Sequence, residues 1–244
     1  MKVTLIDSAG GDLSVVNSAR VSFNKEVTEL SDKDEKLIMY LAEHKHHTPF
    51  RHNFIQLRCE APVFLARQLM KHQAGLTWNE ESRRYIDYTP ELYMPKVWRK
   101  RPEGGIKQGS SGVIDLDKLN DIDGRHIKDY WHETTGPVLE GDYHDGIYPE
   151  TSVLGAIEFH MNEALDLYER LLKLDVAPEQ ARMVLPQNMM IKFIWSGNLL
   201  AFHHVYSLRS GDGAQEEARI FADLLKRAIE PVFPISWKAL EKNT

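Results

Sequence analysis

Hydrophobic and polar residues alternate along several stretches of the chain, which is the pattern of a β-strand with one buried face. Within residues 53–61 the positions of one face are Ile55, Leu57, Cys59 and Ala61. A second alternating stretch ends before Gly197 and contains Ile191, Phe193 and Trp195. Residues 2–7 also read as a strand. The pattern therefore predicts these strands and indicates that the side chain of Cys59 points toward the interior.

Apolar residues recur every three or four positions elsewhere, as they do along one face of a helix. Ser31 can cap one such helix together with Asp34 and Glu35, and the apolar stripe that follows is Leu37, Ile38, Leu41 and Ala42. The clearest helix covers residues 152–174, and we expect its apolar stripe to pack in the core or in a subunit interface. Residues 214–229 predict a further helix, which Pro231 ends. The architecture is thus mixed α and β.

Residues 99–150 differ from the rest because they hold more than half of the chain's 15 glycines and many charged side chains. Such a composition predicts an insertion of loops and short hairpins. Surface loops tolerate insertions well, so we favour surface decoration over a lid. With this excursion, residues 1–244 are predicted to form a single domain.

Composition limits the class of protein. A chain of 244 residues with 42% hydrophobic content can bury a substantial core. The formal charge of −6 argues against a general nucleic-acid binder, although a local cationic pocket would still attract an anionic substrate. No signal peptide and no apolar run long enough to span a bilayer is visible. The single cysteine excludes an intramolecular disulfide and is typical of a reducing cytoplasm.

Residues 67–85, RQLMKHQAGLTWNEESRRY, concentrate cations, amides and hydroxyls after an apolar run. The run predicts a largely buried helix that carries Ala61, Val63, Phe64, Leu65, Leu69 and Met70. Gln68 and His72, like Arg67 and Lys71, are four residues apart and would be neighbours on this helix. Gly75 would end it, and residues 77–84 would form a polar loop. Because cations neutralise phosphate and amides fix orientation, this helix and loop could converge on a phosphorylated ligand.

The same residues resemble the signature of the flavin-dependent thymidylate synthases. That signature is an Arg-His-Arg core followed by Ser or Thr, Asn-Glu and Ser-x-Arg-Tyr, and the matching residues are Lys71, His72, Gln73, Thr77, Asn79, Glu80, Ser82, Arg83, Arg84 and Tyr85. Lys71 and Gln73 stand where the family has arginines, and the stretch from His72 to Asn79 is one residue longer. Lysine lacks the bidentate fork of arginine, so the flavin contacts at these positions differ.

Other parts of the chain carry the resemblance in the same order. Residues 19–23 resemble an early ARVSF element, and residues 46–52 resemble a histidine-rich TPF turn. Residues 182–186 resemble an ARxVLP element, and residues 198–209 resemble the last active-site helix, which ends in Leu-Arg. Only residues 99–150 lie outside the resemblance. Ordered elements of this kind are more specific than a lone motif.

The resemblance implies an α+β fold, in which helices flank an antiparallel sheet, and a homotetramer with active sites shared between subunits. It implies methylation of dUMP to dTMP with 5,10-methylenetetrahydrofolate as one-carbon donor, NADPH as reductant and FAD as hydride carrier. The expected flavin contacts are Ser22, His46, Thr48, Lys71, His72, Gln73, Glu80, Asn198, Leu200 and His204. For the pair at 203–204, we expect His203 to pack within the helix and His204 to bind the ligand.

The resemblance also implies a set of dUMP contacts, which are Gln68, Lys71, Glu80, Glu81, Ser82, Arg83, Arg84, Arg182 and Arg209. Arg83 would contribute mainly through its backbone. Arg209 is the expected catalytic residue, because a permanent guanidinium stabilises negative charge that develops on uracil without giving up a proton. Alternatively, Arg209 only complements a helix dipole, which is worth about 0.3 to 1 kcal/mol.

Three other interpretations remain open at this stage. The charged segment could be a solvated surface without a ligand. His44, His46, His47 and His52 could form the metal site of a hydrolase, although no HExxH spacing accompanies them. Arg83, Arg84, Tyr85 and Tyr88 could serve a nucleotide- or RNA-binding module, although the acidic charge argues against it. A thymidylate synthase with a cysteine nucleophile is disfavoured, because a buried cysteine is usually inert.

Overall fold

The structure is a computed structural model that describes residues 1–102, 104, 109–122, 125–126 and 152–243. The chain divides into two compact units. The first comprises Met1–Glu81, Lys107–Gly109 and Met190–Thr244, and the second comprises Ser82–Ile106 and Ser110–Met189. The single domain expected from the sequence stays a prediction.

The first unit is built on an antiparallel sheet of four strands in the order β1-β2-β8-β3. These strands are β1 (Lys2–Ala9), β2 (Phe54–Pro62), β8 (Met190–Gly197) and β3 (Leu76–Glu80). Leu57 pairs with Trp195 and Cys59 with Phe193 in the register of β2 and β8. All four of these side chains are buried, so the alternation read from the sequence does mark the inner face and the strand predictions are confirmed.

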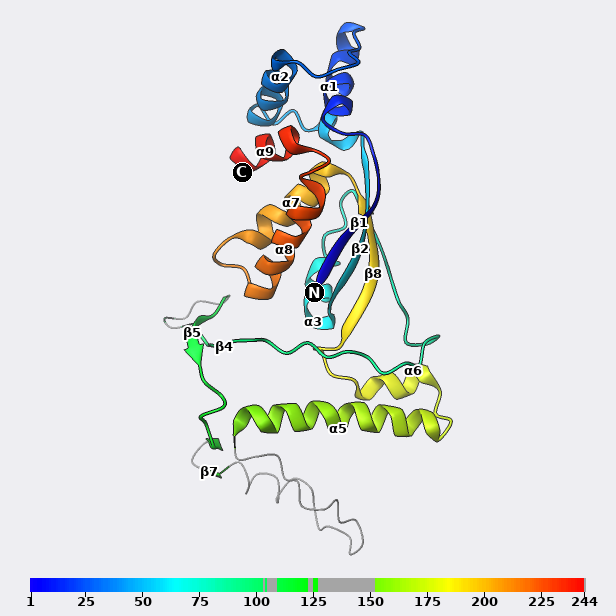
Figure 1. The fold of residues 1–244 in the computed structure, drawn as a ribbon, viewed down its shortest axis with the longest axis vertical. Coiled ribbons are helices and arrows are strands. Elements are labelled where there is room, and N and C mark those ends of the chain that lie inside the picture. Colours follow the sequence, from blue (N-terminus) through cyan, green and yellow to red (C-terminus); the bar gives the residue numbers. More distant parts are fainter. Residues whose placement is uncertain (103, 105–108, 123–124, 127–151, 244) are drawn as a thin grey trace, which may run out of the picture. The chain divides into compact units, whose positions relative to one another are not determined.

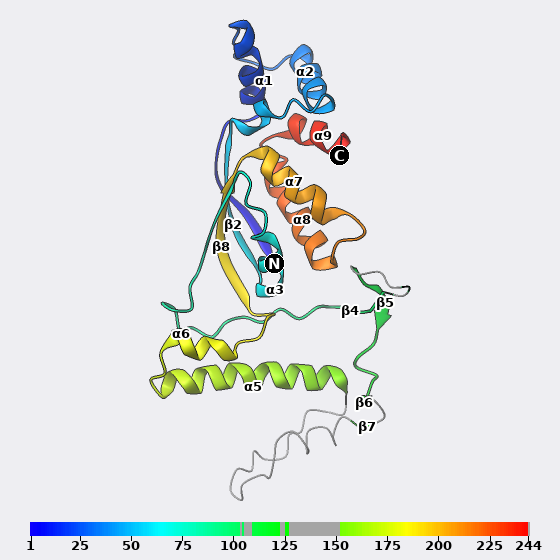
Figure 2. The same cartoon turned by 180° about the vertical axis from the view of Figure 1, so that it is seen from behind.

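Helices cover that inner face. Figures 1 and 2 show α7 (Leu199–Ser210) and α8 (Glu216–Ile229) on the same side of the sheet. The ring of Phe221, on α8, stacks at 6.3 Å from the ring of Phe193. Trp195 meets Phe202 of α7 edge to face at 5.4 Å. The antiparallel sheet with helical cover confirms the α+β fold.

Short helices close one end of the first unit. They are α1 (Asp12–Arg20), η1 (Val21–Phe23), α2 (Asp32–Glu43), η2 (Thr48–Arg51) and α9 (Pro234–Lys242). Ser31 and Asp34 form the expected capping box of α2. The buried Asp12 accepts hydrogen bonds from the backbone N–H groups of Ile235 and Ser236 at 2.9 and 2.8 Å, and so ties α9 to α1.

Two expectations for residues 61–84 are wrong. The helix α3 covers only Val63–Leu69, because β2 continues to Pro62 and a turn from Leu69 O to His72 N follows the helix. Lys71 and His72 therefore lie beyond α3 rather than on its surface, and Gly75 does not end it. The predicted polar loop begins instead as β3, an edge strand that pairs with β8.

The second unit contains α5 (Val153–Lys173), α6 (Pro178–Ala181) and η3 (Arg182–Val184). Its short strands are β4 (Trp98–Lys100), β5 (Ser111–Ile114), β6 (Asp121–Ile122) and β7 (Arg125–His126), which pair as two hairpins. Short hairpins were expected within 99–150, and residues 103, 105–108, 123–124 and 127–150 of that predicted insertion lie outside the described residues.

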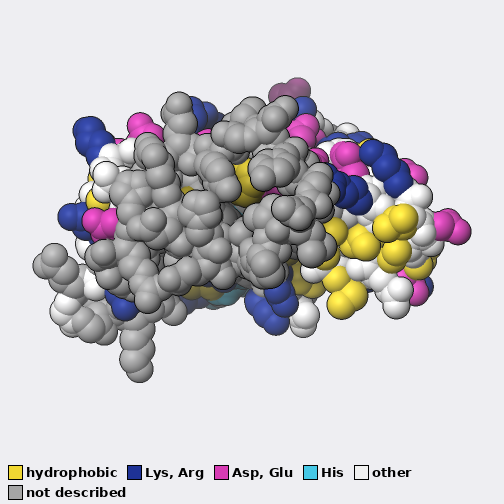
Figure 3. All heavy atoms as spheres, turned by 90° about the horizontal axis from the view of Figure 1, so that it is seen from below, with side chains coloured by type: hydrophobic (Ala, Val, Ile, Leu, Met, Phe, Trp, Pro, Cys, Tyr) yellow, Lys and Arg dark blue, Asp and Glu magenta, His cyan; other side chains and the backbone are white. Residues whose placement is uncertain are grey.

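The predicted helix at 152–174 is confirmed as α5, with Ser152 accepting a hydrogen bond from Gly155 N at 3.1 Å as its amino cap. Only Ala156 and Tyr168 of this helix are buried among the described residues. Three large apolar side chains of the second unit are exposed, namely Leu167 of α5, Leu174 directly after α5 and Met183 of η3. Figure 3 shows hydrophobic side chains at the surface beside the grey residues. Much of the apolar stripe of α5 is thus not buried in the core of the second unit.

Candidate active site

Arg209, in the last turn of α7, lies against the residues that follow α3. Its Nε–H donates a hydrogen bond to Nε2 of His72 at 3.1 Å, and its Nη2–H donates to the backbone carbonyl of Gln68 at 3.5 Å. Gln68 Nε2 in turn donates to Oε1 of Gln215 at 2.7 Å. The fold therefore brings together three residues expected at the site, namely Gln68, His72 and Arg209, and adds Gln215.

The charge state of His72 follows from this contact. Partial burial lowers the pKa of His72, and the positive charge of Arg209 and the neighbouring His204 lower it further. An imidazole nitrogen that accepts from a guanidinium must carry a lone pair, so the ring is neutral at pH 7. Arg209 thus keeps its full charge next to a neutral acceptor, and the cluster carries one net positive charge with no carboxylate in these contacts.

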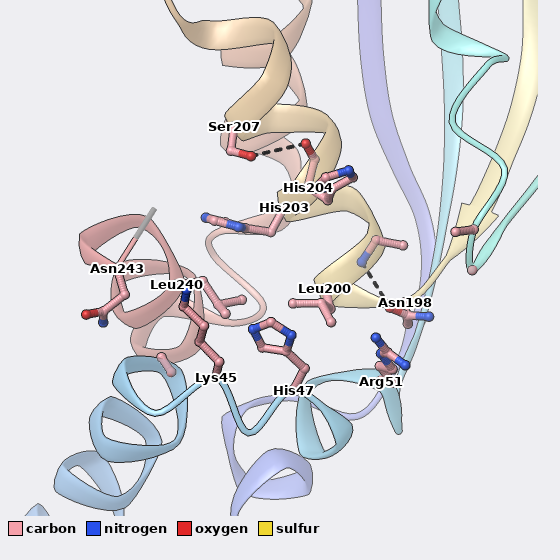
Figure 4. Close-up of a pocket in the computed structure, with 14 residues that line it drawn as sticks. Lys45, His47, Arg51, Asn198, Leu200, His203, His204, Ser207, Leu240 and Asn243 are labelled. Carbon is pink, nitrogen blue, oxygen red and sulfur yellow. Dashed lines mark hydrogen bonds between the residues drawn. The ribbon is translucent and has the colours of Figure 1, made fainter.

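A cavity of about 620 Å³ opens beside the start of α7. Figure 4 shows side chains from α7, from α9 and from the segment after α2 that surround it. Asn198, Leu200 and His204, all expected flavin contacts, line this cavity. The other lining residues are Ala42, Lys45, His47, Arg51, Ala74, Gly75, Ala201, His203, Ser207, Leu240 and Asn243.

Gly75 lies in the wall of this cavity, close to the start of α7. Gly75 has a φ of +74°, and a Cβ built there would lie 2.7 Å from Nδ2 of Asn198 and 3.2 Å from Cβ of Ala201. Asn198 is itself fixed, because its Oδ1 accepts from Ala201 N at 3.0 Å as the amino cap of α7. Gly75 is therefore required for the close approach of the α3–β3 connection to the start of α7.

His203 and His204 differ in burial, and the ligand role of His204 stays a prediction. His203 is 5% exposed and lies edge to face with Trp237 at 5.3 Å. Burial lowers its pKa to about 4, against a smaller opposing effect of Glu241. His204 is exposed and its ring centroid is 6.2 Å from that of His72. His203 does pack, as predicted, but it also lines the cavity.

Several other expected flavin contacts lie in the first unit without lining this cavity. Ser22 is exposed in η1 and Thr48 is exposed in η2. The ring of His46 lies 6.1 Å from that of Tyr40. Lys71 and Gln73 are exposed in the turn after α3. The roles of these residues stay predictions.

The two adjacent carboxylates at the end of β3, Glu80 and Glu81, have different partners. Glu80 accepts a hydrogen bond from Trp78 Nε1 at 3.0 Å and is exposed. Glu81 extends the pairing with β8, because its N–H donates to Lys192 O at 2.9 Å and its Oε1 accepts from Lys192 N at 3.2 Å. Glu80 is thus the carboxylate of the pair that projects from the sheet edge.

The remaining expected dUMP contacts, Ser82, Arg83, Arg84 and Arg182, belong to the second unit. Arg84 forms an ion pair of 3.3 Å with Glu179, whose backbone carbonyl also accepts from Arg182 Nε at 3.3 Å. Both arginines are exposed. The second unit therefore gathers two cations around Glu179.

Arg83 is unlike its neighbour because its side chain is buried. Its guanidinium carbon lies 4.4 Å from the ring centroid of Tyr88, and its Nη1 donates to the carbonyl of the same residue. The side chain of Arg83 is thus engaged within the protein, which is consistent with the expectation that Arg83 contributes mainly through its backbone.

Cys59 has no access to solvent. Burial raises the pKa of its thiol well above its usual range, so the thiolate that a nucleophile requires is not formed near pH 7. The sequence-based expectation of an inert cysteine on the inner face of β2 is thereby confirmed.

Among the residues that the structure describes, no group of three or more His, Cys, Asp or Glu side chains is arranged to hold a metal ion. Within the same residues, no helix is both long and apolar enough to cross a bilayer.

Sequence reasoning missed Lys45, His47, Arg51 and Gln215. The first three lie in or beside the histidine-rich turn, but their side chains meet α7 and α9 only in the tertiary structure. Gln215 lies 147 positions from Gln68. The only sequence signal for Gln215 was its position as a polar residue at the start of the helix predicted over 214–229.

Comparisons with known proteins agree with these observations. The family model described as "Thymidylate synthase complementing protein" matches residues 4–235. The flavin-dependent thymidylate synthase of Kosmotoga olearia is 30% identical over 237 residues, which cover 97% of this chain and 88% of the relative. A flavin-dependent thymidylate synthase of Thermus thermophilus is 31% identical over 241 residues, with 99% and 76% coverage.

A similar solved structure is that of a UMP/dUMP methylase, PolB from Streptomyces cacaoi, bound with 5-Br dUMP. It superposes with a TM-score of 0.75 and 26% sequence identity, and the match covers 99% of this chain and 94% of that one.

Proposed function

The chain belongs to the family of flavin-dependent thymidylate synthases, and we propose from this premise how its own residues carry out the methylation of dUMP to dTMP. The cosubstrates are 5,10-methylenetetrahydrofolate, which donates the carbon, and NADPH, which donates the electrons. FAD is the cofactor, and when bound it supplies a hydride carrier between the two.

The electron balance assigns a task to each component. A methylene group must gain two electrons to become a methyl group, and NADPH provides them, so the folate leaves as tetrahydrofolate. The protein has to activate uracil without a thiolate, because its single cysteine is buried. Activation must therefore come from charge placed beside the uracil ring.

Arg209 carries that charge in this proposal. Its contacts with His72 and with the Gln68 carbonyl fix the guanidinium at the end of α7. A fixed cation stabilises an anion that develops on a uracil oxygen or at N3, and it needs no reorganisation during the reaction. The Arg209–His72–Gln68 cluster is the observation that most strongly supports this assignment.

We assign the dUMP phosphate to Ser82, Arg84 and Arg182, with Arg83 contributing mainly through its backbone. Arg84 and Arg182 are exposed cations of the second unit that share Glu179. Gln68, Lys71, Glu80 and Glu81 complete the proposed contacts to the nucleotide. A phosphate dianion prefers several cations and hydroxyl groups, and Ser82, Arg84 and Arg182 supply such groups.

The flavin is assigned to the cavity beside α7. The cavity fits an anionic dinucleotide, because its lining includes Lys45 and Arg51 and no carboxylate. Asn198, Leu200 and His204 would contact the flavin there. The further contacts that we assign to it are Ser22, His46, Thr48, Lys71, His72, Gln73 and Glu80.

A homotetramer with active sites shared between subunits is part of the proposal. The exposed apolar side chains of Leu167, Leu174 and Met183 support self-association, because large exposed apolar groups favour burial in an interface. A cytoplasmic location is also proposed and is supported by the single reduced cysteine.

The test is an anaerobic assay of purified protein with FAD, NADPH, 5,10-methylenetetrahydrofolate and dUMP. We expect dTMP only when all four are present. Omission of each in turn provides the controls, and UMP replaces dUMP in a parallel series because PolB is described as a UMP/dUMP methylase. Protein that binds flavin but forms no dTMP would contradict the proposed reaction, and a preference for UMP would change the substrate.

A further inference from the structure

Three basic side chains from one short segment line the cavity beside α7. Lys45, His47 and Arg51 lie between the end of α2 and the end of η2. Figure 4 shows His47 directed into the cavity and Arg51 beside Asn198 at the start of α7. None of the three belongs to the flavin contacts assigned above.

The ionisable side chains that line this cavity are all basic. Among its fourteen lining residues there are two permanent cations and three histidines, and no aspartate or glutamate. In the described part of the chain, no carboxylate lies within ion-pair distance of Lys45 or Arg51. Such an excess is unusual in a chain with a formal charge of −6, and it produces a local positive potential.

A helix end on the cavity wall adds independent support for an anionic ligand. The amino end of α7, a helix of 12 residues, lies on the same cavity wall through Asn198, Leu200 and Ala201. Helix amino ends carry a partial positive charge that favours anions.

The lowered pKa of His47 is consistent with the same positive potential. Burial lowers the pKa of His47, and the charges of Arg51 and Lys45 lower it further. The ring is therefore largely neutral at pH 7 and can still donate one hydrogen bond.

We propose that Lys45, His47 and Arg51 form a pyrophosphate subsite of this cavity, which binds the diphosphate bridge of a dinucleotide cofactor. The inference rests on the proposed function, because it takes flavin binding in this cavity as given. FAD and NADPH share the diphosphate group, so the chemistry of the subsite is common to both. FAD is the expected occupant, since Asn198 and His204 on the same wall are assigned to flavin.

The test compares cofactor binding by a double variant, Lys45→Asn with Arg51→Gln, with binding by the unaltered protein. Asparagine is chosen because Lys45 has a φ of +55°, a conformation that asparagine tolerates better than alanine does. The control is Lys33→Gln with Arg227→Gln, which removes one lysine and one arginine that are exposed and do not line the cavity.

Quenching of flavin fluorescence gives the dissociation constants of FAD and riboflavin, and protein fluorescence gives that of NADPH. For FAD we expect a dissociation constant that is roughly tenfold higher in the double variant, with a weaker dependence on salt. Riboflavin has no diphosphate and should bind both proteins equally. The control pair should bind FAD as the unaltered protein does. A loss confined to NADPH would keep the subsite but change its occupant.

Unchanged dissociation constants for both FAD and NADPH would overturn the subsite. An equal loss of FAD and riboflavin would also overturn it, because the effect would then not depend on the diphosphate. Failure of the unaltered protein to bind any flavin would instead remove the proposed function, and the subsite with it. The far-ultraviolet circular dichroism of each variant shows whether folding is retained.

Discussion

Acidification should destabilise the protein through His203. The imidazole is 5% exposed between α7 and α9, and its Nε2 has no partner among the described residues. Burial holds its pKa at about 4, whereas the pKa of an imidazole in the unfolded chain is near 6.5. Between these two values the unfolded chain binds a proton that the folded protein does not bind.

The sign and size of the effect follow from this difference. Because the unfolded state binds more protons, the free energy of unfolding falls as pH drops below 6.5 and levels off below about 4. The shift of about 2.5 pKa units corresponds to about 3 kcal/mol in total. Of this, about 2.5 kcal/mol should be lost between about pH 7.5 and about pH 4.5.

Urea unfolding followed by circular dichroism at these two pH values measures the loss. In His203→Leu the side chain stays apolar and cannot titrate, so the acid loss should shrink by about 2.5 kcal/mol. The control is His52→Gln, which removes an exposed imidazole and should leave the acid loss as it is. If His203→Leu loses as much stability on acidification as the unaltered protein, the reasoning about His203 is refuted.

Other predictions concern the active site. Arg209→Ala should keep its fold and flavin but lose turnover by about a hundredfold to a thousandfold; full activity would remove Arg209 from the mechanism. Gln215→Ala frees the Gln68 amide, so the KM for dUMP should rise by about fivefold to tenfold with a smaller change in kcat; an unchanged KM would show that Gln215 does not position Gln68. Gly75→Ala forces a Cβ to within 2.7 Å of Asn198 Nδ2 at a φ of +74°, which should lower the free energy of unfolding by about 1 to 2 kcal/mol; an unchanged urea midpoint would contradict this.

Local sequence patterns were sufficient to predict the strands and helices that bury one face and expose the other. The alternation around Cys59 predicted β2, because successive side chains of a strand face opposite sides. Ser31 predicted the start of α2, because its hydroxyl can satisfy a backbone N–H group at a helix end, and the three- to four-residue spacing of apolar side chains predicted α5. These signals lie within a few residues of the element that they specify.

The segment after β2 could not be read in the same way. Its apolar residues fit a helix up to Met70, but the end of α3 at Leu69 depends on where β2 stops and where β3 must begin. The strand β3 has exposed polar residues at Thr77 and Asn79, and its main apolar contact is the ring of Trp78, 3.6 Å from that of Phe193 on β8. Such an edge strand is specified by its partner rather than by its own pattern.

The candidate site shows the same limit. The resemblance to the family pointed to Arg209, His72 and Gln68 separately, and the fold brings them within hydrogen-bond distance. Lys45 and Arg51 could not be assigned from sequence, because nothing local links them to α7. Their place in the cavity depends on how η2 packs against α7, which is a long-range contact.

The central claim is that this chain methylates dUMP by flavin chemistry without a cysteine nucleophile. The most direct measurement is an anaerobic single turnover of Cys59→Ala and of the unaltered protein, each with reduced flavin, dUMP and 5,10-methylenetetrahydrofolate. We expect both proteins to form dTMP in an amount equal to the flavin reoxidised, because the Cys59 thiol is buried in the sheet. A Cys59→Ala variant that is folded and loaded with flavin but forms no dTMP would contradict the account.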